Sequence, residues 1–204
     1  MRVISGTYRG LHLGTLRGGN LRPTSDQMRE TLFDVLGPGV EGASFLDAYA
    51  GSGAVGIEAL SRGASEVVFI EHHRAAQQLI RKNLESLGIE SGYYLIRSTV
   101  TTGLERLEQE GSKFNFVFLD PPYKEIGEYH HVLRVLGRSH LLNANSRVIA
   151  EHSRHCLLEE EYGNLRRDRL IRHGDAQLGF YRVMELGNRE QSIVCSPLPP
   201  WGRR

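Results

Sequence analysis

The chain has 204 residues, of which 40% are hydrophobic and 24% charged, with a formal net charge of +1. This is an ordinary globular composition, long enough for one domain with a modest extension and a real hydrophobic core. Its two cysteines, Cys156 and Cys195, lack a ligand-like spacing, which argues against a disulfide scaffold and a zinc site. No apolar run reaches the length of a membrane span or signal peptide, so we expect a cytoplasmic protein rather than a membrane protein.

Apolar runs alternate with helical patterns from about residue 25 to residue 155. The predicted helices cover 25–35, capped by Thr24 or Ser25, then 55–61, 74–87, 104–110 and 129–136. The predicted strands cover 44–49, 67–70, 93–96, 114–119, 147–150, 165–171 and 178–185. The alternation predicts an α/β fold with an open, mostly parallel seven-stranded sheet, helices on both faces and a C-terminal antiparallel hairpin.

Two carboxylates flank a glycine turn near the start of this pattern. Residues 47–53 read Asp-Ala-Tyr-Ala-Gly-Ser-Gly where the first strand ends, and Glu71 closes the next strand. Ligands of open α/β sheets bind at the carboxyl ends of the strands, and a carboxylate there can accept hydrogen bonds from both ribose hydroxyls. We therefore expect a cofactor held by Asp47, Tyr49, Gly51, Ser52, Gly53 and Glu71.

The same turn also fits a dinucleotide fingerprint, because Gly51, Gly53 and Gly56 satisfy G-x-G-x-x-G and Glu71 has the matching spacing. Asp47 favours another cofactor, since a pyrophosphate on the helix N-terminus would be repelled by this carboxylate. S-adenosylmethionine carries no phosphate, and its ammonium and sulfonium groups suit carboxylates. The sequence favours S-adenosylmethionine, with a nicotinamide cofactor or a turn without any ligand as the alternatives.

A second site follows the strand at 114–119, where Asp120, Pro121, Pro122 and Tyr123 stand in a row. Successive prolines restrict the backbone and lack N–H groups, so this step can aim bare carbonyls into a pocket. The Asp120 carboxylate and the Pro121 carbonyl match the two hydrogens of an exocyclic base amine. Holding both hydrogens frees the nitrogen lone pair for in-line attack on a sulfonium methyl, and Tyr123 can stack on the base. The alternative is a rigid loop with a purely structural role.

These residues resemble those of the class I, Rossmann-like N-methyltransferases, and more specifically the RsmD family of bacterial 16S rRNA guanine-N2 methyltransferases. The resemblance runs from Met1 to about Leu186. It rests on residues 4–6 and 9–10, 22–33, 46–47, 50–54, 58–64, 118–123 and Gly174. The Arg-Pro-Thr block from Arg22 and the Ser-Arg-Gly-Ala block from Ser61 distinguish this family from other methyltransferases.

The resemblance implies N2 methylation of guanine 966 of 16S rRNA, within the 30S subunit or a late assembly intermediate, with ribosomal proteins as candidate contacts. It implies that Asp47, Gly51, Gly53 and Glu71 bind the cofactor and that residues 120–123 hold the guanine. Arg22 and Thr24 would lie near the reaction centre and bind substrate. We expect a monomer in which 1–24 form a basic extension that contacts RNA, 25–186 form the methyltransferase domain and 187–204 form a poorly ordered tail.

The chain departs from the family in one respect. Relatives place an aspartate after the third strand, where it meets the adenine amino group, whereas residues 97–102 contain no acid here. Ser98 or Thr99 can offer a hydroxyl acceptor instead. We therefore expect a weaker grip on adenine, which Thr99→Asp should strengthen.

Three other functions remain open. A DNA or RNA adenine-N6 methyltransferase uses similar acceptors, although the missing DNA-recognition domain favours structured RNA. An NAD(P)-dependent oxidoreductase leaves residues 120–123 unexplained. A non-catalytic RNA-binding protein is disfavoured by the intact Asp120 and glycine turn.

Histidine and arginine clusters carry less information. The nine histidines include the adjacent pairs at 72–73 and 130–131 but show no metal-ligand spacing, so we expect no metal. The arginines at 166, 167, 169 and 172 are interpreted as solvated surface charges. Arg2, Arg9, Arg17 and Arg22, all before the first acid, are the more suggestive group.

Overall fold

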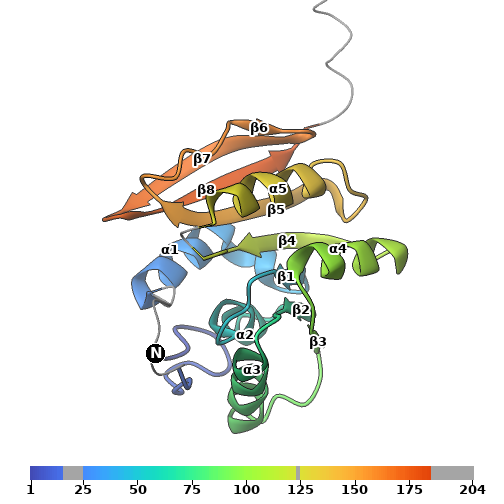
Figure 1. Ribbon diagram of the computed structural model, residues 1–204. Coiled ribbons are helices and arrows are strands. Elements are labelled where there is room, and N and C mark those ends of the chain that lie inside the picture. Colours follow the sequence, from blue (N-terminus) through green and yellow to red (C-terminus); the bar gives the residue numbers. More distant parts are fainter. Residues whose placement is uncertain (16–24, 123–124, 185–204) are drawn as a thin grey trace, which may run out of the picture.

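One eight-stranded sheet, with strand order β3-β2-β1-β4-β5-β8-β7-β6, runs through the computed structural model, which describes residues 1–15, 25–122 and 125–184 (Figure 1). The parallel strands are β1 (Ser44–Asp47), β2 (Glu66–Ile70), β3 (Tyr93–Ile96), β4 (Phe114–Leu119) and β5 (Leu142–Ser153). The antiparallel strands are β6 (Glu161–Tyr162), β7 (Leu165–His173) and β8 (Ala176–Val183). The α/β class and the mixed sheet are confirmed.

The strand count of seven was wrong by one. The additional strand is β6, whose two residues pair with the start of β7 and are too few to show the alternation that identifies a strand in sequence. The predicted C-terminal hairpin is present as β7 and β8. Its second strand, β8, lies between β5 and β7, so the hairpin joins the sheet through the last strand.

Helices cover both faces of the sheet, as the sequence predicts (Figure 1). Helices α1 (Asp26–Leu36), α2 (Ala54–Ser61) and α3 (Arg74–Ser86) enclose one hydrophobic core. Helices α4 (Val100–Gln109) and α5 (Ile126–Leu136) enclose a second core on the opposite face. A short 3-10 helix, η1 (Gly37–Val40), follows α1. Because the parallel strands β1, β2 and β4 are buried on both faces, most of their residues are apolar and do not alternate with polar ones.

Several element boundaries differ from the predicted ranges, among them both ends of β5 and the start of α5. Two of the differences have a local cause. Strand β1 ends at Asp47 rather than at residue 49, and the chain then turns through Gly51, whose φ of 52° is left-handed. Helix α4 begins at Val100 rather than at residue 104, because the Thr99 hydroxyl accepts a hydrogen bond from the Thr102 amide and caps the helix.

Residues 1–15 pack on the α2 and α3 side of the molecule. The chain doubles back through an isolated bridge between Arg2 and His12, and Val3 and Leu13 are buried in the first core. The predicted RNA contact of residues 1–24 stays a prediction, and residues 16–24 lie outside the described part of the chain.

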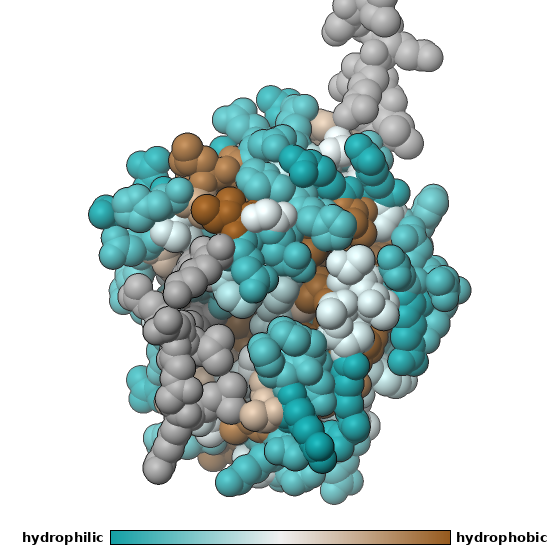
Figure 2. Space-filling model, in the orientation of Figure 1, coloured by the Kyte–Doolittle hydropathy of each residue, from teal (hydrophilic) through white to brown (hydrophobic). Residues whose placement is uncertain are grey.

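The face of the molecule in Figure 2 is largely hydrophilic, with hydrophobic residues only in small separate groups. Among the described helices, none is long and apolar enough to cross a membrane.

Candidate active site

Both sequence motifs lie at the carboxyl edge of the parallel strands. Strand β1 is flanked by β2 on one side and β4 on the other. Asp47 is the last residue of β1, whereas Glu71 and Asp120 directly follow β2 and β4. The amides of Ala48 and Ala50 extend the pairing beyond Asp47, because they donate to carbonyls of β4 and β2. This topology brings the glycine turn and the Asp-Pro-Pro loop to adjoining positions at one edge.

The carboxylate of Asp47 lies at the N-terminus of α2. It is 1% exposed and accepts a hydrogen bond of 3.0 Å from the amide of Gly56 in the first turn. Burial, opposed by this hydrogen bond and reinforced by the charge of Glu71, raises the pKa of Asp47 to about 7. A carboxylate of the protein therefore binds an amide in the first turn of the helix whose N-terminus would hold the pyrophosphate of a dinucleotide. This geometry disfavours the nicotinamide alternative.

Glu71 closes the glycine turn from the neighbouring strand. Its carboxylate oxygens accept from the amide of Gly51 at 2.8 Å and from that of His73 at 2.7 Å. A carboxylate can accept about four hydrogen bonds, so capacity remains for hydroxyl groups of a ligand. A Cβ added at Gly51 would meet no atom within 4 Å, which shows open space above the turn.

Asn83 on α3 forms a hydrogen bond with the same turn, and the sequence did not predict this contact. Its side-chain amide donates to the Ser52 carbonyl at 2.9 Å and to the Gly14 carbonyl at 3.3 Å, and its oxygen accepts from the Gly14 amide at 2.8 Å. Asn83 is 2% exposed. A polar residue on the apolar stripe of a predicted helix is the sequence signal that could have revealed it.

The site has two halves, the glycine turn with Asp47 and Glu71 and the Asp-Pro-Pro loop from Asp120, which we call its half-sites. The first turn of α5 contacts both of them. The hydroxyl of Tyr49, in the glycine turn, donates to the Glu128 carboxylate at 2.9 Å, and burial together with this carboxylate raises the pKa of Tyr49. The next residue, Tyr129, places its hydroxyl 3.2 Å from the Pro121 carbonyl oxygen and 2.8 Å from that of Glu151. Tyr49 was predicted near the cofactor, whereas Glu128 and Tyr129 were not singled out.

The sequence predicts a bare Pro121 carbonyl. In the structure this carbonyl is in contact with the Tyr129 hydroxyl, so that prediction was wrong. A carbonyl oxygen has two lone pairs, so one remains after the contact with Tyr129. Asp120 is partly exposed, Pro121 is buried and Pro122 is exposed. Tyr123, the predicted stacking residue, lies outside the described residues.

The other predicted site residues divide into two groups. Ser98 and Thr99 both follow β3 at the same edge, where the Ser98 hydroxyl donates to the Thr99 carbonyl and the Thr99 hydroxyl caps α4. Their adenine contact stays a prediction. Arg22 and Thr24 are not among the described residues.

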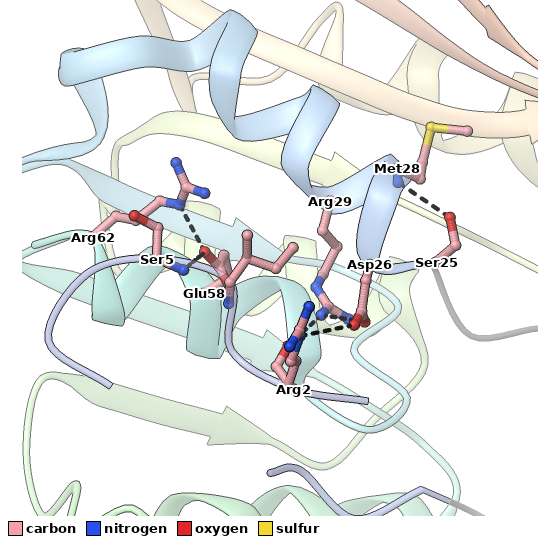
Figure 3. A network of polar contacts seen from close by, with 9 residues as sticks. Arg2, Ser5, Ser25, Asp26, Met28, Arg29, Glu58 and Arg62 are labelled. Carbon is pink, nitrogen blue, oxygen red and sulfur yellow. Dashed lines mark hydrogen bonds and ion pairs between the residues drawn. The ribbon is translucent and has the colours of Figure 1, made fainter. Parts of the chain in front are cut away.

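A buried polar network joins the N-terminal segment to α1 and α2 (Figure 3). Arg29, which is fully buried, donates to the Arg2 carbonyl at 2.6 Å and to Asp26 at 3.0 Å. Burial lowers the pKa of Arg29. Glu58 on α2, also fully buried, accepts from the amides of Ile4 and Ser5 and from Arg62.

Several known proteins are similar to this chain over most or much of its length. The protein "Putative rRNA methyltransferase YlbH" of Bacillus subtilis (strain 168) is 34% identical over 182 residues, which are 89% of this chain and 98% of that protein. "Ribosomal RNA small subunit methyltransferase D" of Escherichia coli (strain K12) is 42% identical over 124 residues, 61% of each chain. The solved structure "Putative methyltransferase yhhF" from Escherichia coli superposes with a TM-score of 0.79 at 34% identity, covering 90% of this chain and 98% of the other.

The family model described as Conserved hypothetical protein 95 matches residues 1–182. That match spans both half-sites and the antiparallel strands up to Arg182. The chain therefore belongs to the Conserved hypothetical protein 95 family, the RsmD family of methyltransferases.

Proposed function

We propose that this protein transfers a methyl group from S-adenosylmethionine to the exocyclic N2 of a guanine in 16S rRNA, at position 966. The observation that carries the proposal is the placement of two half-sites on adjoining strands β1 and β4. One half-site has two carboxylates around a glycine turn, and the other has an Asp-Pro-Pro loop. Relatives named as rRNA methyltransferases support the RNA substrate.

The residues of the first half-site fit S-adenosylmethionine by their charges. Asp47 and Glu71 are both buried carboxylates, and they suit a ligand that carries an ammonium, a sulfonium and a ribose but no phosphate. The open space at Gly51 would admit the ligand close to the backbone. Ser52, Gly53 and Tyr49 line the same turn, and Ser98 or Thr99 after β3 would meet the adenine.

S-adenosylmethionine supplies an electrophilic methyl group on a positively charged sulfur. The chain's part is to bind, orient and deprotonate the guanine amine. The Asp120 carboxylate and the second lone pair of the Pro121 carbonyl would accept the two amine hydrogens and direct the nitrogen lone pair at the methyl carbon. As the N–C bond forms and the C–S bond breaks, the nitrogen becomes positive, and Asp120 would take its proton. Most of the rate would come from positioning and electrostatics.

The 30S subunit or a late assembly intermediate is the proposed form of the substrate. Tyr123, Arg22 and Thr24 are proposed to contact the flipped guanine and its neighbours, and ribosomal proteins to complete the recognised surface. A substrate of this kind places the enzyme in the cytoplasm, where we expect it to act as a monomer.

The test is to incubate the protein with radiolabelled S-adenosylmethionine and unmodified 30S subunits and to map the labelled nucleoside. Asp120→Ala should abolish transfer while leaving cofactor binding intact. Glu125→Gln removes an exposed acid from the same loop and should keep transfer within a few-fold of the parent. Label in N2-methylguanine at one site, dependent on Asp120, would support the proposal. Label in N6-methyladenine, or transfer that survives Asp120→Ala, would refute it.

A further inference from the structure

Three arginines stand in register across the antiparallel part of the sheet. Arg147 of β5 is paired with Arg182 of β8, and Arg182 is paired in turn with Arg166 of β7. Directly paired residues in an antiparallel sheet point to the same face. Neighbouring strands lie about 4.8 Å apart, so this arginine row spans about 10 Å. The three residues lie on three different strands, and the strand order β5-β8-β7 sets them side by side.

The row lies on the face covered by α1. Arg182 follows Phe180 by two residues on β8, and Phe180 and its partner Ile149 belong to the core that α1 encloses. A register shift in β7 between residues 167 and 169 brings Arg169 to the same face, opposite Phe180. Arg167 instead pairs with Tyr181 on the opposite face and donates to the Leu158 carbonyl. The arginine cluster of the sequence is therefore divided between two faces.

The row is not fully neutralised by the protein. Arg147 contacts Asp168, and Arg166 lies 3.7 Å from Glu161. Arg182, in the centre, and Arg169 have no carboxylate partner among residues 1–15, 25–122 and 125–184. Like charges directly opposite each other destabilise a sheet. All four side chains are at least partly exposed, so an anion can reach them.

We infer that Arg147, Arg182, Arg166 and Arg169 bind the phosphodiester backbone of the RNA substrate at a distance from the reaction centre. This inference rests on the proposed function. Arginine binds phosphate oxygens through its planar fork of donors, and phosphate contacts position a protein without reading sequence. Successive guanidinium groups in a line match a string of phosphates better than a single anion.

An anionic membrane surface is the other partner that four arginines could attract. Peripheral membrane binding also uses apolar side chains that enter the interface. The exposed large hydrophobic residues of the described chain are Leu11, Tyr94, Ile126 and Leu157, and none of them belongs to β7 or β8. The surface around the row therefore favours RNA.

The row lies well below the edge that carries the site. Arg147 precedes Glu151 by four residues on β5, which corresponds to about 13 Å along the strand. Glu151 is the residue whose carbonyl meets Tyr129 beside the Asp-Pro-Pro loop. An RNA that presents its guanine at the edge would thus reach the row with a flanking segment. The row should affect RNA affinity and leave the chemical step unchanged.

The experiment compares Arg166→Gln/Arg182→Gln with Arg81→Gln/Arg106→Gln in the full-length protein. The control removes the same charge from exposed positions on α3 and α4. Steady-state methylation of unmodified 30S subunits is measured at several salt concentrations, together with S-adenosylmethionine affinity and thermal stability. Binding to vesicles of anionic phospholipid is measured in parallel.

The expected result is a KM for 30S subunits at least tenfold higher in the row variant, with kcat and cofactor affinity within twofold of the parent. The dependence of KM for 30S subunits on salt concentration should become shallower by about 1.5 in log–log slope, for two lost phosphate contacts. The melting temperature of the row variant should not fall, because repulsion between the like charges is relieved.

If an active parent and the row variant share the same KM and slope, only this inference is refuted. Loss of vesicle binding without a rise in KM for 30S subunits would also refute it. A parent that neither binds nor methylates rRNA would refute the proposed function and this inference together.

Discussion

The Tyr129 hydroxyl lies 3.2 Å from the carbonyl oxygen of Pro121, so the first turn of α5 touches the loop that carries Asp120. One residue earlier, Glu128 accepts from Tyr49 of the glycine turn. Because Pro121 and Pro122 have no amide hydrogen, the loop cannot use its own amides at these positions to continue the ladder between β4 and β5. The single hydroxyl hydrogen of Tyr129 is within reach of both the Pro121 carbonyl and the Glu151 carbonyl, so this group links the loop to β5.

Tyr129→Phe should lower kcat for methyl transfer about tenfold, because the Pro121 carbonyl loses the contact that orients it. The matched control is Tyr181→Phe, since Tyr181 is also buried and its hydroxyl donates to a carbonyl, that of Glu159, away from the site. Both variants should lose about 1 kcal/mol of unfolding free energy. An equal effect of the two variants on kcat would show that Tyr129 acts only through stability.

Asp47 should make cofactor affinity dependent on pH. In the free protein its pKa is raised to about 7, so a buried, protonated carboxyl predominates below that pH. A cationic ligand favours the carboxylate, and affinity should therefore rise with pH and level off above 7. Between pH 8 and pH 6 the Kd for S-adenosylmethionine should increase about tenfold. Calorimetric titration across this range checks it, and Asp47→Asn should bind weakly with a flat profile. A wild-type profile as flat as that of the variant would contradict the assignment.

Thr99→Asp should bind S-adenosylmethionine more tightly than the parent, by about threefold to tenfold for one added hydrogen bond. Aspartate is a good N-cap, so the substitution should keep the cap of α4 and leave stability unchanged. Fluorescence titration of both proteins measures the affinity, with Thr101→Asp as the control within the same helix. Unchanged or weaker binding by Thr99→Asp would remove Thr99 from the adenine site.

Glu58→Ala should destabilise the protein by about 3 kcal/mol, because three donors lose a buried charged acceptor. Glu105→Ala, at an exposed position of α4, should cost less than 0.5 kcal/mol, or about the uncertainty of the measurement. Urea unfolding measures the difference, and hydrogen exchange at Ile4 and Ser5 reports whether the N-terminal segment detaches. Exchange that stays as slow as in the parent would show that Glu58 does not hold this segment.

The elements around the site follow from the sequence because each has a local signal. Strands β3 and β4 are largely apolar and have the bounds that the sequence predicts. Asp47 is the last residue of β1, and Asp120 directly follows β4. Glycine at 51 and 53 marks a turn that needs positive φ, which the structure has at both. Strand β6 has no such signal, because two residues cannot display a period.

Contacts between distant residues could not be predicted in the same way. The link from Tyr129 to Pro121 and Glu151, and that from Asn83 to Ser52, depend on how helices settle on the sheet. Sequence periodicity reports which helix face is buried and does not identify the partner of a buried polar group. The arginine row depends in addition on strand order, since β8 enters between β5 and β7.

The position of β8 also sets an order of events during synthesis. Strand β7 pairs with β8 and with the two-residue β6, so it cannot join the parallel strands until the ribosome has released residues 176–183. Domains generally fold as units during synthesis, and the strands that carry Asp47, Glu71 and Asp120 leave the ribosome long before β8 does. The sheet, and with it the surface formed by Arg147, Arg182 and Arg166, is therefore completed only when residues 176–183 have emerged. A chain that ended before residue 176 would lack β8 and with it the pairing that sets Arg147, Arg182 and Arg166 side by side.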